Sequence, residues 1–218
     1  MSEYAAARLN MVEGQIRPNK VTDPRLVEAM LDIPREVFVP QAARGIAYVD
    51  EDIAVGHGRY LMEPMVFARM LQEVGVGETD AVLDIGTATG YSTAVLARLG
   101  ATVVGVESDA ALAQRAGELL AEVGAVNATV VSGALTEGHP GRAPYDVIVI
   151  EGLVAEVPEA ITAQLADGGR LIAAVMGDRG VGEVKLYQRV GNIVSGRVLF
   201  EAHPRPLPGF EATPKFVF

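Results

Sequence analysis

The sequence predicts an α/β protein built on a seven-stranded, mostly parallel sheet, with helices on both faces and a C-terminal antiparallel hairpin. Between residues 81 and 175, short apolar runs alternate with helical patterns, which is typical of a parallel sheet covered on both faces. Beyond them, two β-rich runs are joined by Gly191-Asn192, a two-residue hairpin signal. A glycine-rich loop at residues 86–90 follows the first alternating strand. This loop predicts a ligand site at one end of the sheet.

Composition indicates a globular protein. The 218 residues are 50% hydrophobic, so we expect one domain, 1–218, with a small N-terminal helical cap and loop (about 1–76) before a core (about 77–218).

A formal charge of −10 argues against a nucleic-acid partner, because phosphate contacts need clustered Lys and Arg. The lack of cysteine excludes disulfides and thiolate metal sites, and we expect no metal. With no signal-peptide pattern and no apolar run of about 20 residues, we expect a cytoplasmic protein without a membrane partner.

Prolines mark the elements of the N-terminal part. Thr22-Asp23-Pro24 predicts a helix start, with a capping side chain before a proline at the first helical position. This helix is expected to run to about Leu31 and to stop near Pro34. Residues 33–40 are expected to cross the surface as an extended or turn segment, and a short helical piece is expected at 41–47.

A loop at residues 55–64 precedes an amphipathic helix. Glycines flank His57, so the backbone there can bend closely around a ligand. His57 is either a loop histidine bonded to nearby backbone or a catalytic residue, and no sequence neighbour completes a triad or a metal set. Pro64 begins the helix and Gly75 ends it. Its apolar positions are Phe67, Met70, Leu71 and Val74.

Strands and helices alternate regularly after residue 80. Strands are expected at about 81–86, 102–107, 128–132, 146–151 and 170–175, and helices at about 91–99, 109–122 and 157–166. Asp109 can cap the second of these helices, and Gly100, Gly124 and Gly168 are expected to close the three in turn. The hairpin strands are expected at 183–190 and 193–200.

The junction of strand, tight loop and helix at residues 81–99 predicts a nucleotide-like ligand. Asp84 ends the apolar run, the loop glycines allow close backbone approach, and the helix N-terminus offers unpaired N–H groups. Ala88 stands where a G-x-G-x-G pattern has its middle glycine, so a purely structural turn remains an alternative. Glu107 ends the next strand, where an acid in dinucleotide and related sites binds ribose hydroxyls.

Four segments form a combination that is more specific than any one motif. They are Val27 to Pro40, Gly56-His57-Gly58 followed by Pro64, Leu83 to Tyr91, and Ala143-Pro144-Tyr145-Asp146 before a strand. In these segments the chain resembles the protein-L-isoaspartate O-methyltransferases, and the resemblance covers roughly residues 11–175. It implies a Rossmann-like methyltransferase fold, with S-adenosylmethionine as cofactor and S-adenosylhomocysteine as product.

The resemblance also implies the residues of the site. Those expected to bind the cofactor are Asp84, Gly86, Thr87, Ala88, Gly90, Glu107, Ser108, Gly133 and Ala134. Those expected to line the substrate pocket are His57, Gly58, Arg59, Tyr60, Met62 and Glu151. No catalytic residue is assigned, because a carboxylate nucleophile is already charged at neutral pH and needs no strong base.

The chain departs from the family pattern at several of these positions. Ala134 stands where the family commonly has an Asp beside adenine. Met62 replaces a serine and Tyr60 a threonine of the family's Gly-Gln-Thr-Ile-Ser-Gln-Pro loop. Glu151 lies where a Val-Thr-Ala-Ala type of sequence is usual. The residues expected to bind the cofactor therefore match the family pattern better than the residues expected to line the substrate pocket.

Three functions follow, in order of preference. The first is a cytoplasmic S-adenosylmethionine-dependent O-methyltransferase of the isoaspartyl repair family, acting on a carboxylate of damaged protein or a related acceptor. The second is a binding or regulatory protein that keeps the cofactor pocket but has lost isoaspartyl transfer, which Met62, Tyr60 and Glu151 favour. The third, a nicotinamide-dependent oxidoreductase, is disfavoured by the hairpin, because dehydrogenases repeat a second βαβ half.

Arg59 and the C-terminal tail each have two possible interpretations. Arg59 is either a local counter-charge for acidic peptide substrates or an ordinary exposed loop cation. The tail, residues 201–218, holds four prolines and three phenylalanines. It is expected to wrap back on the sheet or to meet a second subunit in a homodimer.

Overall fold

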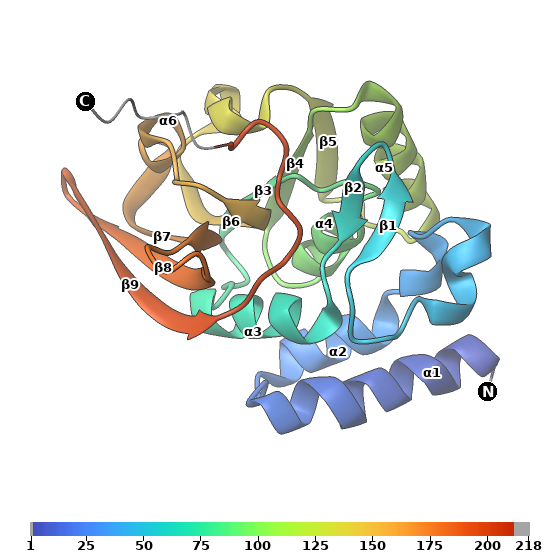
Figure 1. Ribbon diagram of the computed structural model, residues 1–218. Helices are drawn as coiled ribbons and strands as arrows, with labels where there is room; N and C mark the ends of the chain where they lie inside the picture. The colour runs from blue at the N-terminus through green and yellow to red at the C-terminus, as the bar shows by residue number, and fades with distance from the viewer. Residues whose placement is uncertain (1, 212–218) are drawn as a thin grey trace.

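A seven-stranded sheet forms the centre of the protein, and the computed structural model describes residues 2–211 (Figure 1). Its strands are β3 (Ala81–Ile85), β4 (Thr102–Glu107), β5 (Ala128–Ser132), β6 (Tyr145–Val154), β7 (Leu165–Met176), β8 (Gly182–Val190) and β9 (Ile193–Glu201). Their order is β5-β4-β3-β6-β7-β8-β9; the first five in this order run parallel, and β8 and β9 pair antiparallel. The predicted fold class, including the hairpin at Gly191-Asn192, is confirmed.

Two hydrophobic clusters cover the two faces of the sheet, because successive strand side chains point to opposite faces. In β3, Val82 joins one cluster, and Leu83 and Ile85 join the other. The first cluster contains apolar residues of α3 (Pro64–Val74), α4 (Tyr91–Ala97) and α5 (Ala110–Glu122). The second is closed by residues of the single turn α6 (Glu159–Thr162), of the short 3₁₀ turn η5 (Leu135–Glu137) and of the chain after β9; a further 3₁₀ turn, η6 (Pro140–Arg142), is exposed.

The N-terminal part packs its helices beneath α3 (Figure 1). Asp23 caps α2 (Pro24–Asp32), as predicted, and accepts a hydrogen bond from the Arg25 N–H. An additional helix, α1 (Glu3–Met11), was not predicted; its sequence is rich in alanine and buries only Met11 fully, so its apolar periodicity is weak. It continues into η1 (Val12–Ile16) and η2 (Arg17–Asn19). Because these elements share the first cluster with α3 and α4, the cap and the core are packed together.

The expected surface course of residues 33–40 is wrong. Ile33, Arg35 and Phe38 are each at most 1% exposed, and only a short turn, η3 (Arg35–Val37), forms there. Phe38 packs edge-on against the ring of Tyr91 at 5.7 Å between centroids. The two prolines therefore shape a buried crossing above α4, which leads into η4 (Gln41–Ile46), the expected short helical piece.

The helix expected at 157–166 is also wrong in length. Only α6 forms, and β7 already begins at Leu165, which pairs with Tyr145 of β6. The Gln164 side chain donates to the carbonyls of Glu137 and Ala160. The backbone carbonyl of Gln164 accepts from the Tyr145 N–H, so the chain is turned into the sheet there. Gly168, expected to close this helix, has φ +79° and lies within β7.

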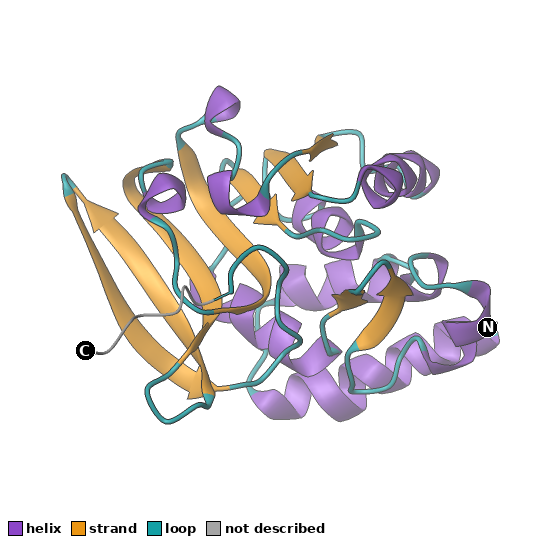
Figure 2. Ribbon diagram, turned by 45° about the horizontal axis from the view of Figure 1, so that its top comes forward, coloured by secondary structure: helices purple, strands orange, loops and turns teal. Residues whose placement is uncertain are grey.

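A small antiparallel hairpin, β1 (Ile53–Gly56) and β2 (Arg59–Leu61), stands where only a loop was expected (Figure 2). Its two connecting residues, His57 and Gly58, both have left-handed backbone conformations, with φ of 54° and 71°. Such turns match the twist of paired strands. The hairpin thereby carries residues 57–62 toward the carboxyl ends of β3 and β4.

The strand order reverses at β3, which lies between β4 and β6. In open α/β sheets, ligands bind in the crevice outside the carboxyl ends of the strands at such a point. The chain after β9 crosses this end of the sheet between β6 and β2 (Figure 1). Within residues 2–211, no helix is long and apolar enough to cross a membrane.

Candidate functional site

The loop after β3 is a tight turn held by backbone hydrogen bonds. The Gly86 N–H donates to the Val106 carbonyl at 2.8 Å, and the Gly90 N–H donates to the Thr87 carbonyl at 2.8 Å. Gly86 and Gly90 have φ of +85° and +94°, which glycine adopts without steric cost. Ala88 also has a positive φ, +50°, and its N–H is used to donate to Glu107. The loop therefore keeps the bend of a glycine-rich turn although an alanine stands at its middle.

Asp84 is a buried carboxylate beside this loop. Its Oδ2 atom accepts hydrogen bonds from the hydroxyls of Ser92, at 2.7 Å, and Thr93, at 2.5 Å. Its Oδ1 atom is buried and has no partner among the described residues. Burial raises the pKa of Asp84 to about 6, although hydrogen bonds from Thr93, Ser92 and Thr87 lower it. An unsatisfied buried oxygen indicates a place for a donor that the chain itself does not supply.

Glu107 is fully buried and surrounded by donors. Its Oε1 atom accepts from the N–H groups of Ser108 and Asp109 at 2.8 and 3.1 Å. Its Oε2 atom accepts from the Ala88 N–H at 2.8 Å and from Arg59, whose Nε and Nη2 atoms both lie at 3.2 Å. Gly133, at the end of β5, donates its N–H to the Glu107 carbonyl at 3.0 Å. The predicted cofactor residues of β3, β4 and β5 are thus brought to one edge of the sheet, and Ala134 follows Gly133 as an exposed residue.

One of the two interpretations of Arg59, an ordinary exposed loop cation, is wrong. Its side chain is 4% exposed, and besides pairing with Glu107 it donates from Nη2 to the Gly86 carbonyl at 2.6 Å. Arg59 was expected to line the substrate pocket, but its guanidinium lies against Gly86 and Glu107, two of the residues expected to bind the cofactor.

Three of the expected substrate residues meet beside the loop. Tyr60, Met62 and Glu151 line two small cavities of about 10 Å³ each, which share these residues. The Oε1 atom of the Glu151 carboxyl is buried and has no hydrogen-bond partner within residues 2–211. Burial and the nearby charge of Asp84 raise the pKa of Glu151 well above its ordinary value, opposed by Arg35 and Arg59.

His57 and Gly58 do not line these cavities. The His57 ring is half exposed, and its Nδ1 atom lies 2.7 Å from Oδ2 of Asp109, the residue that caps α5. This bond ties the tip of the β1–β2 hairpin to the start of α5. Neither the backbone-bonded nor the catalytic interpretation of His57 describes this contact.

Several residues of the site were not predicted. Arg35 is fully buried, donates to the carbonyls of Ala47 and Met62 at 2.9 and 2.7 Å, and lies 4.6 Å from the centre of the Tyr91 ring. Arg35 thus fixes the end of β2. A charged residue between apolar ones in Ile33 to Phe38 was the signal that could have marked it.

Leu207, in the chain after β9, was also missed. It is 2% exposed, and its N–H donates to the Leu153 carbonyl at 2.9 Å. A Cβ atom placed on Gly86 would lie 2.7 Å from Cδ1 of Leu207. The expectation that the tail wraps back on the sheet is therefore confirmed up to Phe210, and residues 212–218 lie outside the described part of the chain.

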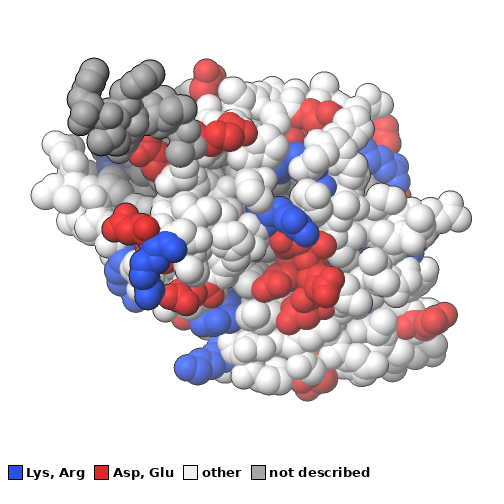
Figure 3. All heavy atoms as spheres, in the orientation of Figure 1, with Lys and Arg blue, Asp and Glu red and all other residues white. Residues whose placement is uncertain are grey.

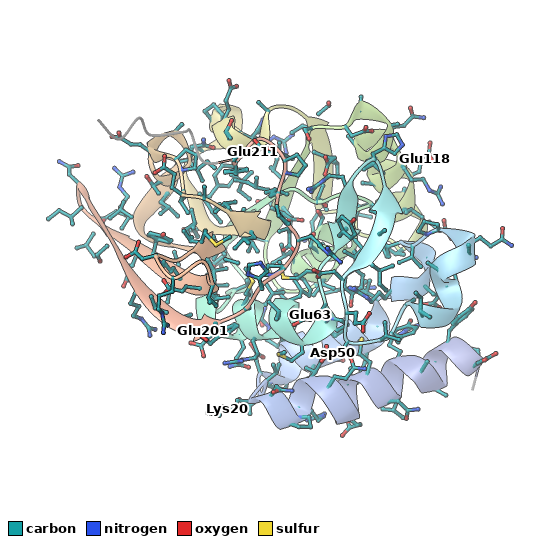
Figure 4. All side chains as sticks on the ribbon, viewed as in Figure 1. Lys20, Asp50, Glu63, Glu118, Glu201 and Glu211 are labelled. Atoms are coloured by element: carbon teal, nitrogen blue, oxygen red, sulfur yellow. The ribbon has the colours of Figure 1, made fainter. Side chains whose placement is uncertain are left out.

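The approach to the cavities is acidic. An open hollow of about 350 Å³ adjoins them, lined by Glu51, Asp52, Glu63, His203, Pro204, Arg205 and Pro206. Figure 3 shows the acidic atoms as a red patch with basic atoms directly above it, and Figure 4 places Asp50 and Glu63 at this patch. Partial burial and the neighbouring Asp50, Asp52 and Glu51 raise the pKa of Glu63 to about 7. Arg205 lies over the Tyr60 ring at 5.3 Å, at the border between hollow and cavity.

Comparisons with known proteins agree with this architecture. A family model described as protein-L-isoaspartate(D-aspartate) O-methyltransferase matches residues 7–201. A protein-L-isoaspartate O-methyltransferase of Methanoculleus marisnigri is 41% identical over 85% of this chain and 84% of its own length. Protein-L-isoaspartate O-methyltransferase 1 of Rhodopseudomonas palustris is 38% identical over 82% of this chain and 73% of its own.

Solved structures give the same result for the fold. A protein-L-isoaspartate O-methyltransferase structure superposes with a TM-score of 0.81 at 28% identity, covering 93% of this chain and 66% of the other. A Plasmodium falciparum protein in complex with S-adenosyl-L-homocysteine has a TM-score of 0.77 at 19% identity, covering 95% of this chain and 99% of its own, and shows likeness of fold alone.

Proposed function

The chain belongs to the protein-L-isoaspartate(D-aspartate) O-methyltransferase family, and we propose that it transfers the methyl group of S-adenosylmethionine to the carboxylate of an isoaspartyl residue. The observation that carries this proposal is the Asp84 to Gly90 loop at the point where the strand order reverses, with Glu107 beside it. Loop, acid and strand order together form the kind of crevice in which nucleotide-like ligands bind.

The chemistry of the crevice fits S-adenosylmethionine. The cofactor carries an ammonium group and a ribose diol, which are donors, and a positively charged sulfonium. The crevice offers acceptors and negative charge: the Gly86 carbonyl, the Glu107 carboxylate and the unpartnered Oδ1 of Asp84. Gly86, Thr87, Ala88 and Gly90 would hold the methionine part, Glu107 and Ser108 the ribose, and Gly133 and Ala134 the adenine. The space directly over Gly86 is occupied by the side chains of Arg59 and Leu207.

The chain's own residues would act by alignment. When bound, S-adenosylmethionine supplies an electrophilic methyl group. A carboxylate acceptor is charged at neutral pH, so the protein must hold it in line and exclude water, a contribution of up to about 7–11 kcal/mol in favourable cases. Met62 and Tyr60 would form the walls beside the acceptor, and Glu151 would face it, because these three residues line both cavities.

A second function, cofactor binding without isoaspartyl transfer, is favoured by one observation. Glu151 places an ionisable carboxyl where an acceptor carboxylate would enter, and Met62 offers no hydroxyl to hold that acceptor. A regulatory protein of this kind would bind S-adenosylhomocysteine but leave isoaspartyl peptides unmethylated.

The remaining assignments also belong to the proposal. We infer that the protein works in the cytoplasm without a membrane partner, and its charge of −10 argues against a nucleic-acid partner. A homodimer through the tail would use a surface other than Leu207 and Phe210, which pack on the chain's own sheet.

Transfer of labelled methyl from S-adenosylmethionine to an isoaspartyl peptide tests the proposal. The peptide carries lysines beside the isoaspartyl residue, to suit the acidic hollow, and the matching aspartyl peptide is the control. We expect labelling of the isoaspartyl peptide only. Binding of S-adenosylhomocysteine without labelling of either peptide would reject transfer and support the second function.

We expect the reaction to lose efficiency at alkaline pH because of Glu151. Its pKa is raised, so the carboxyl is neutral below this pKa and ionises as the pH rises through it. The ionised form repels an acceptor carboxylate. In a pH profile of kcat/KM above neutral pH, the wild type should decline more steeply than Glu151→Gln, which keeps the shape but cannot ionise. Identical profiles for the two proteins would show that Glu151 does not face the acceptor.

A further inference from the structure

The Arg59 side chain fills the crevice in which the cofactor would lie. A Cβ atom placed on Gly86 would lie 2.8 Å from its Nη2 atom, so the guanidinium covers the open face of that glycine. The adjoining cavities hold about 10 Å³ each, room for about one water, whereas pockets for small ligands measure about 300–1,000 Å³. The crevice is thus closed by the chain itself.

The contacts of Arg59 are those that the proposed cofactor would make. Nη2 donates to the Gly86 carbonyl at 2.6 Å, and Nε and Nη2 lie 3.2 Å from Oε2 of Glu107. An ammonium group and ribose hydroxyls are also donors, and they would need the same two acceptors. A guanidinium and the bound cofactor cannot both occupy this place.

A physical reason explains why the chain supplies such a group. Glu107 is fully buried, and a buried carboxylate without a positive partner or donors is costly. The backbone N–H groups of Ala88, Ser108 and Asp109 provide donors but no charge. Arg59 provides the counter-charge while no ligand is present.

The position of Arg59 depends on a small element. It begins the three-residue strand β2, whose hairpin is tied to α5 by the contact between His57 and Asp109 at 2.7 Å. This contact is half exposed, and among the strands of the described residues β2 pairs only with the four-residue β1. A withdrawal of this hairpin would open the crevice without disturbing the large sheet.

We propose that Arg59 is an internal competitor of the cofactor and thereby sets its affinity. In the free protein the guanidinium occupies the acceptors of Gly86 and Glu107, and the cofactor binds only after Arg59 has left them. The inference rests on the proposed function, since it takes S-adenosylmethionine as the ligand. The apparent affinity is reduced by the fraction of molecules in which the crevice is open.

Calorimetric binding of S-adenosylhomocysteine to three proteins tests this inference: the wild type, Arg59→Met and Arg25→Met. The Met side chain keeps much of the arginine stem but removes its donors. Arg25 is a matched control, because it is a partly buried arginine that donates to the carbonyls of Val76 and Leu99 at the opposite end of the sheet. We expect Arg59→Met to bind about tenfold more tightly than the wild type, and Arg25→Met to bind as the wild type does.

The outcomes separate the inference from the proposed function. Binding by the wild type that is equal to or tighter than that of Arg59→Met would overturn the inference and leave the proposed function standing. No binding by any of the three folded proteins would reject the cofactor, and the inference with it. Binding by Arg59→Met alone would support the inference and reject the proposed function for the wild type.

An NMR measurement on the wild type covers the case in which Arg59→Met does not fold. The Nε–H signal of Arg59 should be protected from solvent exchange in the free protein, because it is buried against Glu107. We expect S-adenosylhomocysteine at saturation to remove this protection. A signal that stays protected in the complex would overturn the inference.

Discussion

Replacing Glu107 by alanine is expected to lower the free energy of unfolding by about 3–5 kcal/mol, the usual cost of leaving a buried charge without its partner. The substitution leaves the Arg59 guanidinium, 4% exposed, with the Gly86 carbonyl as its acceptor and no carboxylate. It also removes the acceptor of the Ala88, Ser108 and Asp109 N–H groups. Domains of this size have a total stability of about 5–15 kcal/mol, so denaturant unfolding should show a clear loss.

Two further variants identify the cause of this loss. Glu118→Ala removes an exposed carboxylate that pairs with Arg115 at 3.2 Å, and we expect little or no loss, because exposed ion pairs contribute little to stability. Combining Glu107→Ala with Arg59→Met removes both buried charges, so the double variant should lose less than the sum of the two single variants. A loss below about 1 kcal/mol for Glu107→Ala would show that the pair is not buried as described.

The cofactor side of the site could be predicted because its signals are local. The strands at 102–107 and 128–132 were predicted with the bounds that the structure shows. Glu107 could be placed beside the glycine loop because parallel strands end at one edge of a sheet. Each of these inferences needs only an apolar run, its last residue and the loop that follows.

The position of Arg59 could not be predicted in this way. It depends on a contact with Glu107, 48 residues further along the chain, and on a hairpin whose strands have four and three residues. Strands this short carry no alternation pattern. The turn between them contains His57 at φ 54°, a conformation uncommon for residues other than glycine. Leu207 is likewise brought to the site by a pairing with Leu153 that no local pattern indicates.

Gly86→Ala is expected to weaken binding of S-adenosylhomocysteine by about 100-fold or more, equivalent to about 2.7 kcal/mol. The new methyl group would point into the crevice, where the atoms nearest to it are Cδ1 of Leu207 at 2.7 Å and Nη2 of Arg59 at 2.8 Å. Both belong to flexible side chains that can move away, but the surface on which the ligand would lie is then occupied by the methyl group itself. The left-handed φ of +85° adds a loss of stability of about 1–2 kcal/mol.

Gly75→Ala separates the loss of binding from the loss of stability. Gly75 ends α3 with φ +61°, and apart from its chain neighbours no heavy atom of residues 2–211 lies within 4 Å of a Cβ atom placed on it. This variant should therefore lose a similar amount of stability in denaturant unfolding and bind S-adenosylhomocysteine as the wild type does. If calorimetry shows the same affinity for both variants, the ligand does not lie against Gly86. If only Gly86→Ala loses affinity, backbone strain is excluded as the cause, and the open face of Gly86 is identified as the surface that the cofactor contacts once Arg59 has left it.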